Sequence, residues 1–454
     1  MNRFAFLGWL GCAFLPLSLL ALPETPHQPN FVFILADDLG YGDLGCYGAP
    51  DIETPHLDRL AAEGLRFTGA YANGAVCTPT RLAFLTGRFH QRTGIDNALY
   101  YQEHGRGIPA GSDTIASLLR DAGYATGLSG KWHLGYDEER RPRAQGFDHF
   151  FGLLGGNHHY FAHMDRIGVH DLWLGNEPVH RDGYTTDLVT TDAIRFVETH
   201  RERPFFLFVS HPAPHFPWQG PGDGAKTVKP KTKSWQLGDR PTYAAMVESM
   251  DDGIGRLVAR IDALGLGNRT LIVFTSDNGG HTWSRNSPFR GAKASLWEGG
   301  IRVPAIARWN KTIPPGTETP DTVVTMDWTA TFLALAGVEP AQGFLDGVDL
   351  TPVLTRQGQV VDRTLFWRRR PGPVRKTVPV EHAVRQGKWK YLARPAENFV
   401  ALYDLEADPG ETTNRLDTST GGQAVDEANA MARSLREQWE RWERSIEADA
   451  STHR

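Results

Sequence analysis

The sequence has few cysteines and no excess of positive charge, and the charge balance restricts its possible functions. Only three of its 454 residues are cysteine, and 48 lysine and arginine residues stand against 53 aspartate and glutamate residues, for a net charge of −5. The chain has no basic stripe of the kind that nucleic-acid-binding proteins carry, so we expect no nucleic-acid partner. A weakly acidic protein also does not attract polyanions over long range. If the substrate is anionic, the positive charge that binds it must be local.

Internal repeats and long low-complexity tracts are absent from the sequence, and the N-terminus stands apart from the rest. Arg3 precedes a short apolar run that Pro16 interrupts and that ends near Ala21, which is typical of a secretory signal peptide. We expect residues 1–23 to be removed and the protein to be exported to the periplasm or the extracellular space, without stable insertion into a membrane. An uncleaved membrane anchor is the alternative. A lipoprotein anchor at Cys12 is disfavoured, because Trp9 stands where a small aliphatic residue is needed.

Buried strands alternate with helices through most of the chain. The segments 30–40, 204–215 and 270–280 contain continuous apolar runs, which are typical of strands covered on both faces. Together with the helical spacing at 57–65 and 243–265, they predict an α/β fold with a large, mostly parallel mixed sheet flanked by helices. After about residue 360 the pattern changes to antiparallel strands and a helix with an apolar stripe. We therefore divide the chain into a catalytic domain at 24–360 and a smaller C-terminal antiparallel sheet with a covering helix at 361–454.

Polar side chains follow four of the predicted strands. They are Asp37 and Asp38, Lys131 and His133, His211 and His215, and Asp277 and Asn278. Ligands of parallel sheets bind at the carboxyl ends of the strands. We therefore expect these side chains to meet at one site.

The acidic members of this set predict a metal site. Adjacent carboxylates repel each other unless a cation neutralises them, and oxygen donors suit calcium or magnesium better than zinc, which prefers His and Cys. The alternative is that Asp37, Asp38, Asp277 and Asn278 cap the elements that follow them. Because both acidic pairs follow buried strands, we favour a metal.

Lys131, His133, His215 and Lys293 add two cations and two titratable rings. Taken singly, a lysine is usually a solvated surface charge and a histidine is usually structural. Beside a divalent metal, the four would form a pocket for a small tetrahedral oxyanion, with phosphorus or sulfur as the attacked centre.

Cys77 lies in an unusual setting, Cys77-Thr78-Pro79-Thr80-Arg81, followed by Thr86-Gly87-Arg88. In an oxidising compartment Cys77 could pair with Cys46, but a disulfide does not explain Pro79 and Arg81. The segment resembles the C-x-P-x-R and TGR signature of the type I formylglycine-dependent sulfatases, the arylsulfatase and N-acetylgalactosamine-6-sulfatase group of the alkaline phosphatase superfamily. The segments 36–40, 130–135, 213–217, 275–279 and 293–300 stand in the order of this family, so the resemblance extends over residues 29 to 454.

The resemblance implies a sulfuric ester hydrolase with a modified cysteine. A formylglycine-generating enzyme that recognises Pro79 and Arg81 would oxidise Cys77 to formylglycine (3-oxoalanine). One hydroxyl of the hydrated aldehyde would then attack sulfur and form a covalent sulfo-enzyme. The residues that would bind calcium are Asp37, Asp38, Asp277, Asn278 and residue 77.

The resemblance also assigns roles to the remaining site residues. Arg81 would stabilise the hydrated aldehyde, while Lys131 and Lys293 would neutralise the sulfate oxygens. His215 would protonate the leaving oxygen as a general acid, and His133 would take the proton whose loss expels sulfate.

The expected substrate is a sulfated saccharide, such as a 6-sulfated N-acetylgalactosamine or galactose, or an aryl sulfate. Polar loops at 155–165 and 218–240 follow strand ends, where specificity usually lies. The candidate substrate-binding residues are His158, Tyr160, His211, Trp218 and Trp297, although aromatic side chains more often serve packing.

Two rival functions remain. A phosphatase or phosphodiesterase of the same superfamily would carry Ser or Thr at position 77, and a non-catalytic glycan-binding protein should have lost one of the catalytic residues.

Overall fold

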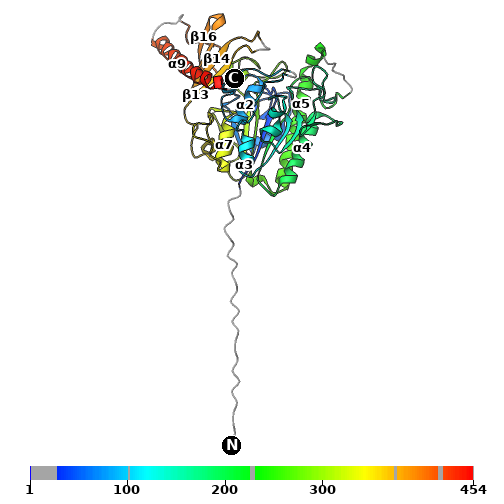
Figure 1. The fold of residues 1–454 in the computed structure, drawn as a ribbon. Helices are drawn as coiled ribbons and strands as arrows, with labels where there is room; N and C mark the ends of the chain where they lie inside the picture. The colour runs from blue at the N-terminus through cyan, green and yellow to red at the C-terminus, as the bar shows by residue number, and fades with distance from the viewer. Residues whose placement is uncertain (2–27, 101–102, 225–230, 373–375, 418–422, 453–454) are drawn as a thin grey trace.

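A computed structural model describes residues 1, 28–100, 103–224, 231–372, 376–417 and 423–452 of the chain (Figure 1). The predicted signal peptide, including Cys12, lies outside the described residues apart from residue 1. Among the helices of the described part, none combines the length and the apolar character needed to cross a membrane.

A mixed sheet of ten strands forms the centre of the molecule. Across the sheet the strands are, in order, β11 (Thr317–Thr319), β2 (Leu65–Phe67), β10 (Ala305–Arg308), β9 (Thr270–Ser276), β1 (Asn30–Ala36), β8 (Phe205–Ser210), β4 (Ala125–Lys131), β5 (His149–Leu153), β6 (Trp173–Leu174) and β7 (Glu177–Pro178). The five strands from β9 to β5 run parallel, whereas β10 and β6 join them as antiparallel neighbours. The mostly parallel mixed sheet predicted from the sequence is confirmed.

Helices cover both faces of this sheet (Figure 1). The main helices on one face are α1 (Pro55–Ala62), α4 (Thr185–His200) and α5 (Arg240–Ala263), and those on the other are α2 (Cys77–Thr86), α3 (Ile115–Asp121) and α7 (Asp327–Ala336). In β1, Phe33 stacks on Phe84 of α2 with 3.8 Å between the ring centroids, while Val32 and Ile34 belong to the core on the α5 side. A strand covered on both faces buries every side chain, which explains its continuous apolar run.

The C-terminal part is a four-stranded antiparallel sheet with one long helix. Its strands are β13 (Thr364–Arg369), β14 (Glu381–Gln386), β15 (Trp389–Arg394) and β16 (Phe399–Asp404), and its helix is α9 (Gln423–Thr452). Trp442 of α9 stacks on Phe366 of β13 with 5.0 Å between the ring centroids, and Ile446 is fully buried. The predicted small sheet and covering helix are confirmed. The division at residues 360 and 361 stays a prediction.

Shorter elements connect these layers. They are β3 (Ala70–Tyr71), β12 (Val323–Val324), α6 (Glu298–Ile301) and α8 (Thr351–Leu354). Leu296 and Ile301, which flank the start and end of α6, lie in the same apolar cluster as Leu402 of the C-terminal sheet. The two parts of the chain therefore share a core.

The strand register brings the predicted polar strand ends together. Leu35 of β1 pairs with Ser210 of β8 on one side and with Thr275 of β9 on the other, and Ser210 also pairs with Gly130 of β4. These four strands end at the same edge of the sheet. The residues that follow them therefore converge on one place, which is the candidate active site.

Candidate active site

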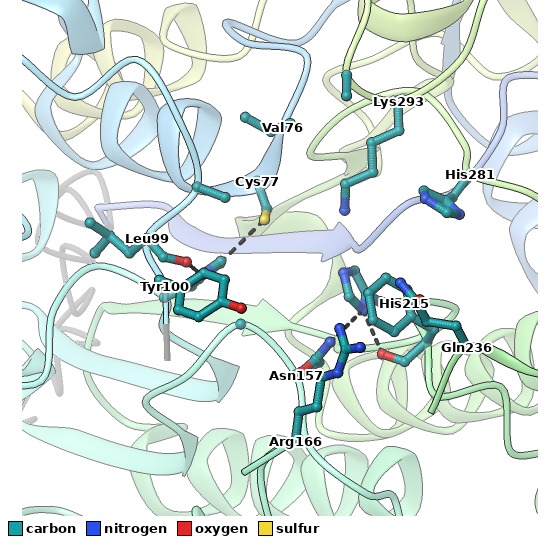
Figure 2. A pocket seen from close by; sticks show the side chains of 15 residues that line it. Val76, Cys77, Leu99, Tyr100, Asn157, Arg166, His215, Gln236, His281 and Lys293 are labelled. Carbon is teal, nitrogen blue, oxygen red and sulfur yellow. Dashed lines mark hydrogen bonds between the residues drawn. The ribbon is translucent and has the colours of Figure 1, made fainter. Parts of the chain in front are cut away.

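Cys77 is the first residue of α2 and lies at a pocket of about 220 Å³ (Figure 2). All ten residues of α2 are buried, and Cys77 itself is 2% exposed. The polar residues that share this pocket with Cys77 are Tyr100, His133, Asn157, Arg166, His215, Gln236, His281 and Lys293. The cysteine is therefore presented to a polar pocket from the N-terminus of a buried helix.

The threonines of the Cys77 motif fix the start of α2. The Thr80 hydroxyl accepts a hydrogen bond from the Gly74 N–H (3.0 Å) and lies 3.2 Å from the Gly74 carbonyl oxygen. The Thr78 hydroxyl donates to the His133 carbonyl (3.0 Å) and accepts from the Leu99 N–H (3.1 Å). Pro79 stands in the first turn of the helix, where its missing N–H removes no helical hydrogen bond. The segment around Cys77 is thus tied to the neighbouring loops on both sides.

His133 directs an unprotonated ring nitrogen at Cys77. Its Nε2 lies 3.1 Å from the Leu99 carbonyl oxygen, which can only accept a hydrogen bond, so Nε2 carries the proton. Its Nδ1 lies 3.2 Å from the Cys77 Sγ. Burial, together with the Lys131 and Arg81 charges, holds the pKa of His133 well below its usual value. The neutral ring is therefore placed to accept a proton from a group at position 77.

The ring of His215 is oriented by a backbone carbonyl and faces the acidic cluster. Its Nδ1 lies 2.6 Å from the Phe216 carbonyl oxygen, so Nδ1 donates, and Nε2 is left facing Asp38 Oδ2 at 3.5 Å. The Tyr160 hydroxyl lies 3.0 Å from the His215 carbonyl oxygen and 2.7 Å from the Pro212 carbonyl oxygen. Tyr160 thus holds the backbone that carries His215, and it is not in the set that lines the pocket.

The four predicted metal ligands lie together and are buried. Three of their oxygens have no hydrogen-bond partner although they are buried, namely Asp37 Oδ1, Asp38 Oδ2 and Asn278 Oδ1. Two groups of ligand atoms each fall within 4.8 Å of one another. One group is a carboxylate oxygen of Asp37, a carboxylate oxygen of Asp38 and a ring nitrogen of His215, and the other is a carboxylate oxygen of Asp37, a carboxylate oxygen of Asp277 and the Cys77 sulfur. Buried polar atoms are almost always paired, so three unpaired oxygens in one cluster are what a cation site requires.

The electrostatics of the acidic cluster agree with this. Burial and repulsion from Asp277 raise the pKa of Asp37 to about 8. Burial alone would also raise the pKa of Asp38, but the Lys293 ammonium and the His215 ring lower it below its usual value. The carboxylates are therefore crowded enough that bound positive charge would stabilise them.

The three predicted cations each pair with a carboxylate of this cluster. The Arg81 guanidinium donates to Asp277 Oδ2 (2.8 Å from Nη2), and the Lys131 ammonium contacts Asp37. Lys293 Nζ lies 2.5 Å from Asp38 Oδ1. Lys293 lines the pocket, whereas Arg81 and Lys131 are fully buried and are not among its lining residues. Contact between Lys131 and a sulfate therefore remains a prediction.

The two histidines predicted to bind substrate lie away from the pocket. His158 is buried, with Nδ1 2.9 Å from the Asp171 carbonyl oxygen and Nε2 2.9 Å from the Thr185 hydroxyl. His211 is buried at the end of β8, where burial lowers its pKa to about 3. Neither ring lines the pocket. Their surroundings are those of histidines in the core.

The two predicted tryptophans also pack against other side chains. Trp297 faces the C-terminal sheet, with 5.6 Å between its ring centroid and that of Tyr403, and the Arg290 guanidinium lies 3.9 Å from its ring. Trp218 contacts Phe216 and His281, which themselves line the pocket. Trp218 therefore supports the wall of the pocket from behind.

Five polar pocket residues were not identified from the sequence. They are Tyr100, Asn157, Arg166, Gln236 and His281. Asn157 and Gln236 fall within the loops predicted to determine specificity, and Arg166 directly follows the first of them. His281 follows the segment 277–280, so its position after a strand end was a usable signal.

Comparisons with known proteins agree with this geometry. The family model described as "Sulfatase" matches residues 29–338, and the one described as "N-sulphoglucosamine sulphohydrolase, C-terminal" matches residues 291–439. N-acetylgalactosamine-6-sulfatase of Rattus norvegicus is 35% identical over 388 residues, covering 78% of this chain and 70% of that protein. Arylsulfatase A of Homo sapiens is 34% identical over 455 residues, covering 88% of this chain and 86% of that protein.

Solved structures give the same result. The structure of Ps i-CgsB matches with a TM-score of 0.81 and 32% identity, over 92% of this chain and 93% of that chain. A second structure of Ps i-CgsB, 31% identical, is a complex with k-i-k-neocarrahexaose. The chain belongs to the sulfatase family, whose members are sulfuric ester hydrolases.

Proposed function

We propose that this enzyme removes sulfate from a sulfated saccharide, using formylglycine at position 77 and a bound calcium ion. The observation that carries the proposal is the placement of Cys77. It lies at the pocket with His133 Nδ1 3.2 Å from its sulfur, and Lys293 and His215 lie in the same pocket (Figure 2). A nucleophile, a base, a cation and a second histidine thus surround one small space.

The described residues fit a calcium ion. The donor set consists of hard oxygens from Asp37, Asp38, Asp277 and Asn278, which is the chemistry that calcium prefers. The three buried oxygens without a partner belong to this set. We propose that these four residues and residue 77 hold the ion.

Formylglycine at position 77 is the second proposed cofactor. Cys77 and Cys46 are both free thiols, so the alternative disulfide between them is not formed in the structure. A disulfide partner is therefore not the reason for the Pro79 and Arg81 context. We propose that a formylglycine-generating enzyme reads this context during maturation.

Formylglycine supplies a hydrated aldehyde as the nucleophile, and calcium supplies Lewis-acid polarisation of the sulfate. The chain's own side chains do the rest. His133 Nδ1 accepts a proton at position 77, with its ring fixed by the Nε2–H bond to Leu99. Lys293 neutralises a sulfate oxygen from the wall of the pocket. Lys131 and Arg81 hold the carboxylates in place through their ion pairs with Asp37 and Asp277.

His215 would act as the general acid toward the leaving oxygen. Its Nδ1–H bond to the Phe216 carbonyl leaves Nε2 to deliver the proton. Burial and the Lys293 charge lower the pKa of His215 well below its usual value. A sulfate ester bound beside the ring adds negative charge, which acts in the opposite direction and favours the protonated ring.

A saccharide is the favoured substrate class. The relatives include N-acetylgalactosamine-6-sulfatase, and the Ps i-CgsB structure holds a neocarrahexaose. We propose a 6-sulfated N-acetylgalactosamine or galactose as the unit that is cut, with aryl sulfates as the alternative. We also propose export through the N-terminal segment, for which the sequence pattern around Arg3 and Pro16 is the support.

Mass spectrometry of the peptide 67–81 tests the proposal. In protein produced with the modifying enzyme, the residue at 77 should carry a carbonyl oxygen in place of sulfur, and the preparation should release sulfate from at least one member of a panel of sulfated sugars. Arg81→Ala should reduce both conversion and activity, and Cys77→Ala should be folded but inactive. Full activity from a protein whose Cys77 is unmodified would contradict the mechanism.

A further inference from the structure

The wall of the pocket that faces Cys77 and Lys293 is formed by two loops. Figure 2 shows Arg166 and Gln236 on this wall, with the Arg166 guanidinium beside Asn157 and directed toward the pocket. Arg166 belongs to the connection between β5 and β6, and Gln236 ends a short 3-10 helix, η5 (Lys233–Gln236). The two loops are far apart in the sequence, but Arg166 and Gln236 line the same pocket.

The Arg166 side chain has no partner among the described residues. No ion pair or hydrogen bond reaches its guanidinium, although the side chain is half-buried at the pocket. The pocket's other strong cation, Lys293, is paired with Asp38 at 2.5 Å. A half-buried guanidinium without a carboxylate has lost part of its hydration and gained no compensating charge. A bound anion would therefore stabilise the Arg166 guanidinium.

Arg166 is held in a built turn. The buried Asp165 carboxylate accepts hydrogen bonds from the Ile167 N–H (3.0 Å) and the Val169 N–H (2.8 Å), and the Gly168 N–H donates to the Asp165 carbonyl (3.0 Å). The Arg166 carbonyl in turn accepts from the Lys231 N–H of the second loop (2.8 Å). The backbone of Arg166 is thus fixed before any ligand binds, which lowers the cost of ordering it.

The charge of the pocket is one-sided. Among the described residues that line it, none is aspartate or glutamate, while Arg166 and Lys293 are cations. The protein as a whole carries a net charge of −5, so the positive charge of these two residues is local. One sulfate between Cys77 and Lys293 would leave Arg166 unpaired on the opposite wall. The pocket therefore has more anion-binding capacity than a single sulfate uses.

We propose that Arg166, assisted by the Gln236 amide, binds a second anionic group of the substrate, so that the preferred substrate carries a sulfate ester or a carboxylate in addition to the sulfate that is removed. This inference rests on the proposed function. The guanidinium offers a planar pair of N–H donors that matches either group bidentately. Gln236 is exposed, has no side-chain partner among the described residues, and can add an N–H donor. Arg166 and Gln236 are specificity residues and take no part in bond cleavage.

The test compares 4-nitrophenyl sulfate, which has no second anionic group, with three saccharides that share the 6-sulfate to be removed. The saccharides are N-acetylgalactosamine 6-sulfate, the same sugar with a second sulfate, and the same 6-sulfated sugar linked to a uronic acid. Wild-type enzyme should prefer one of the last two, and which one it prefers identifies the second group as sulfate or carboxylate. Arg166→Gln should lower kcat/KM on that substrate about 10- to 100-fold, as expected for losing a hydrogen bond between charged groups, and should leave 4-nitrophenyl sulfate turnover unchanged.

Two further variants keep the result interpretable. Arg166→Lys retains the charge but not the paired donors, so it should recover part of the loss. Arg181→Gln removes an exposed arginine that donates to the His180 carbonyl (3.1 Å) and should behave as wild type. Equal losses on all substrates with Arg166→Gln, or a wild-type enzyme indifferent to the second anionic group, would overturn the inference.

Binding to an inactive enzyme separates this inference from the proposed function. In a Cys77→Ala background, calorimetry is done with each of the two doubly anionic sugars. At least one of them should bind with an affinity that Arg166→Gln weakens and Arg181→Gln does not. If no sulfated substrate is turned over by wild-type protein, the proposed function fails, and the binding result still decides the role of Arg166. Equal affinity with and without the Arg166 change refutes that role.

Discussion

Replacing Lys390 by methionine should destabilise the enzyme and impair its active site from a distance. Lys390 of β15 is fully buried, and its Nζ lies 2.9 Å from Glu298 Oε1 and 2.8 Å from Glu411 Oε1. Both glutamates are also fully buried. Methionine fills a similar volume but leaves two carboxylates without their shared cation.

The size of the effect follows from this burial. Removing one partner of a buried ion pair costs about 3–5 kcal/mol. An unfolding entropy of about 2 cal/mol/K per residue, over roughly 400 residues, converts this loss into a fall in Tm of about 4–6 °C. The loss should grow as the pH rises above about 7, because burial raises the pKa of Glu411 to about 7 in the wild-type protein, and the variant lacks the cation that stabilises the charged form of this carboxyl above that pH.

The same network supports the loop that carries Lys293. Glu411 accepts a hydrogen bond from the Glu298 N–H (2.6 Å), and Glu298 lies five residues after Lys293 in the chain. A displacement of about 1 Å can cost a rate factor of up to roughly 100. We expect kcat/KM for Lys390→Met to fall about tenfold at a temperature where the variant is still folded.

Thermal unfolding and steady-state kinetics check these expectations against a matched control. Lys388→Met removes a neighbouring lysine whose side chain is 41% exposed and whose ion pair with Asp404 is 2.7 Å long. Exposed pairs contribute about 0–1 kcal/mol, so this variant should stay within about 1 °C of wild type. Adding Glu411→Gln to Lys390→Met should recover part of the stability, because one unpaired carboxylate is removed. A Tm for Lys390→Met equal to that of Lys388→Met would refute the reasoning.

Three other predictions concern the metal, the general acid and acid stability. Chelation should abolish activity and lower Tm, and added calcium should restore both; a verified metal-free preparation with full activity would exclude the ion. His215→Ala should slow a sugar sulfate more than an activated aryl sulfate, because a general acid helps most when the leaving oxygen is basic; equal losses would remove His215 from this role. Burial lowers the pKa of His90 to about 4, so the unfolded chain takes up this proton first and stability falls as the pH drops from 6.5 towards 4. The loss is about 2 kcal/mol at pH 5, and urea unfolding of His90→Gln should show a smaller dependence on pH in this range than wild type.

The sequence was sufficient for the fold class and for the residues around Cys77 because their signals are local. The apolar run of β1 needs burial on both faces whatever its partners are. Asp37, Asp38, Asp277 and Asn278 follow strand ends, and parallel strands place these ends at one edge of the sheet. Their convergence could therefore be predicted without knowing any long-range contact.

Other site assignments depended on contacts that no local pattern records. The sequence offered Trp297 as a possible stacking residue, but the C-terminal sheet supplies Tyr403 as its packing partner. His158 was a candidate substrate-binding residue, yet hydrogen bonds to Asp171 and Thr185 satisfy both of its nitrogens. The residue type of a tryptophan or a histidine is the same in a core and in a pocket, so only its neighbours in the fold distinguish packing from substrate binding.

By itself, the sequence determined which chemical groups are present and which strands carry them to the active edge. The tertiary structure decided which of these groups line the pocket. Arg166 stands in a loop without a recognisable motif, and it reaches the pocket because its turn is closed by Asp165 and joined to Lys231 of a second loop. The direction of a loop side chain is set by hydrogen bonds between segments far apart in the chain, and those form only when the sheet has brought the segments together.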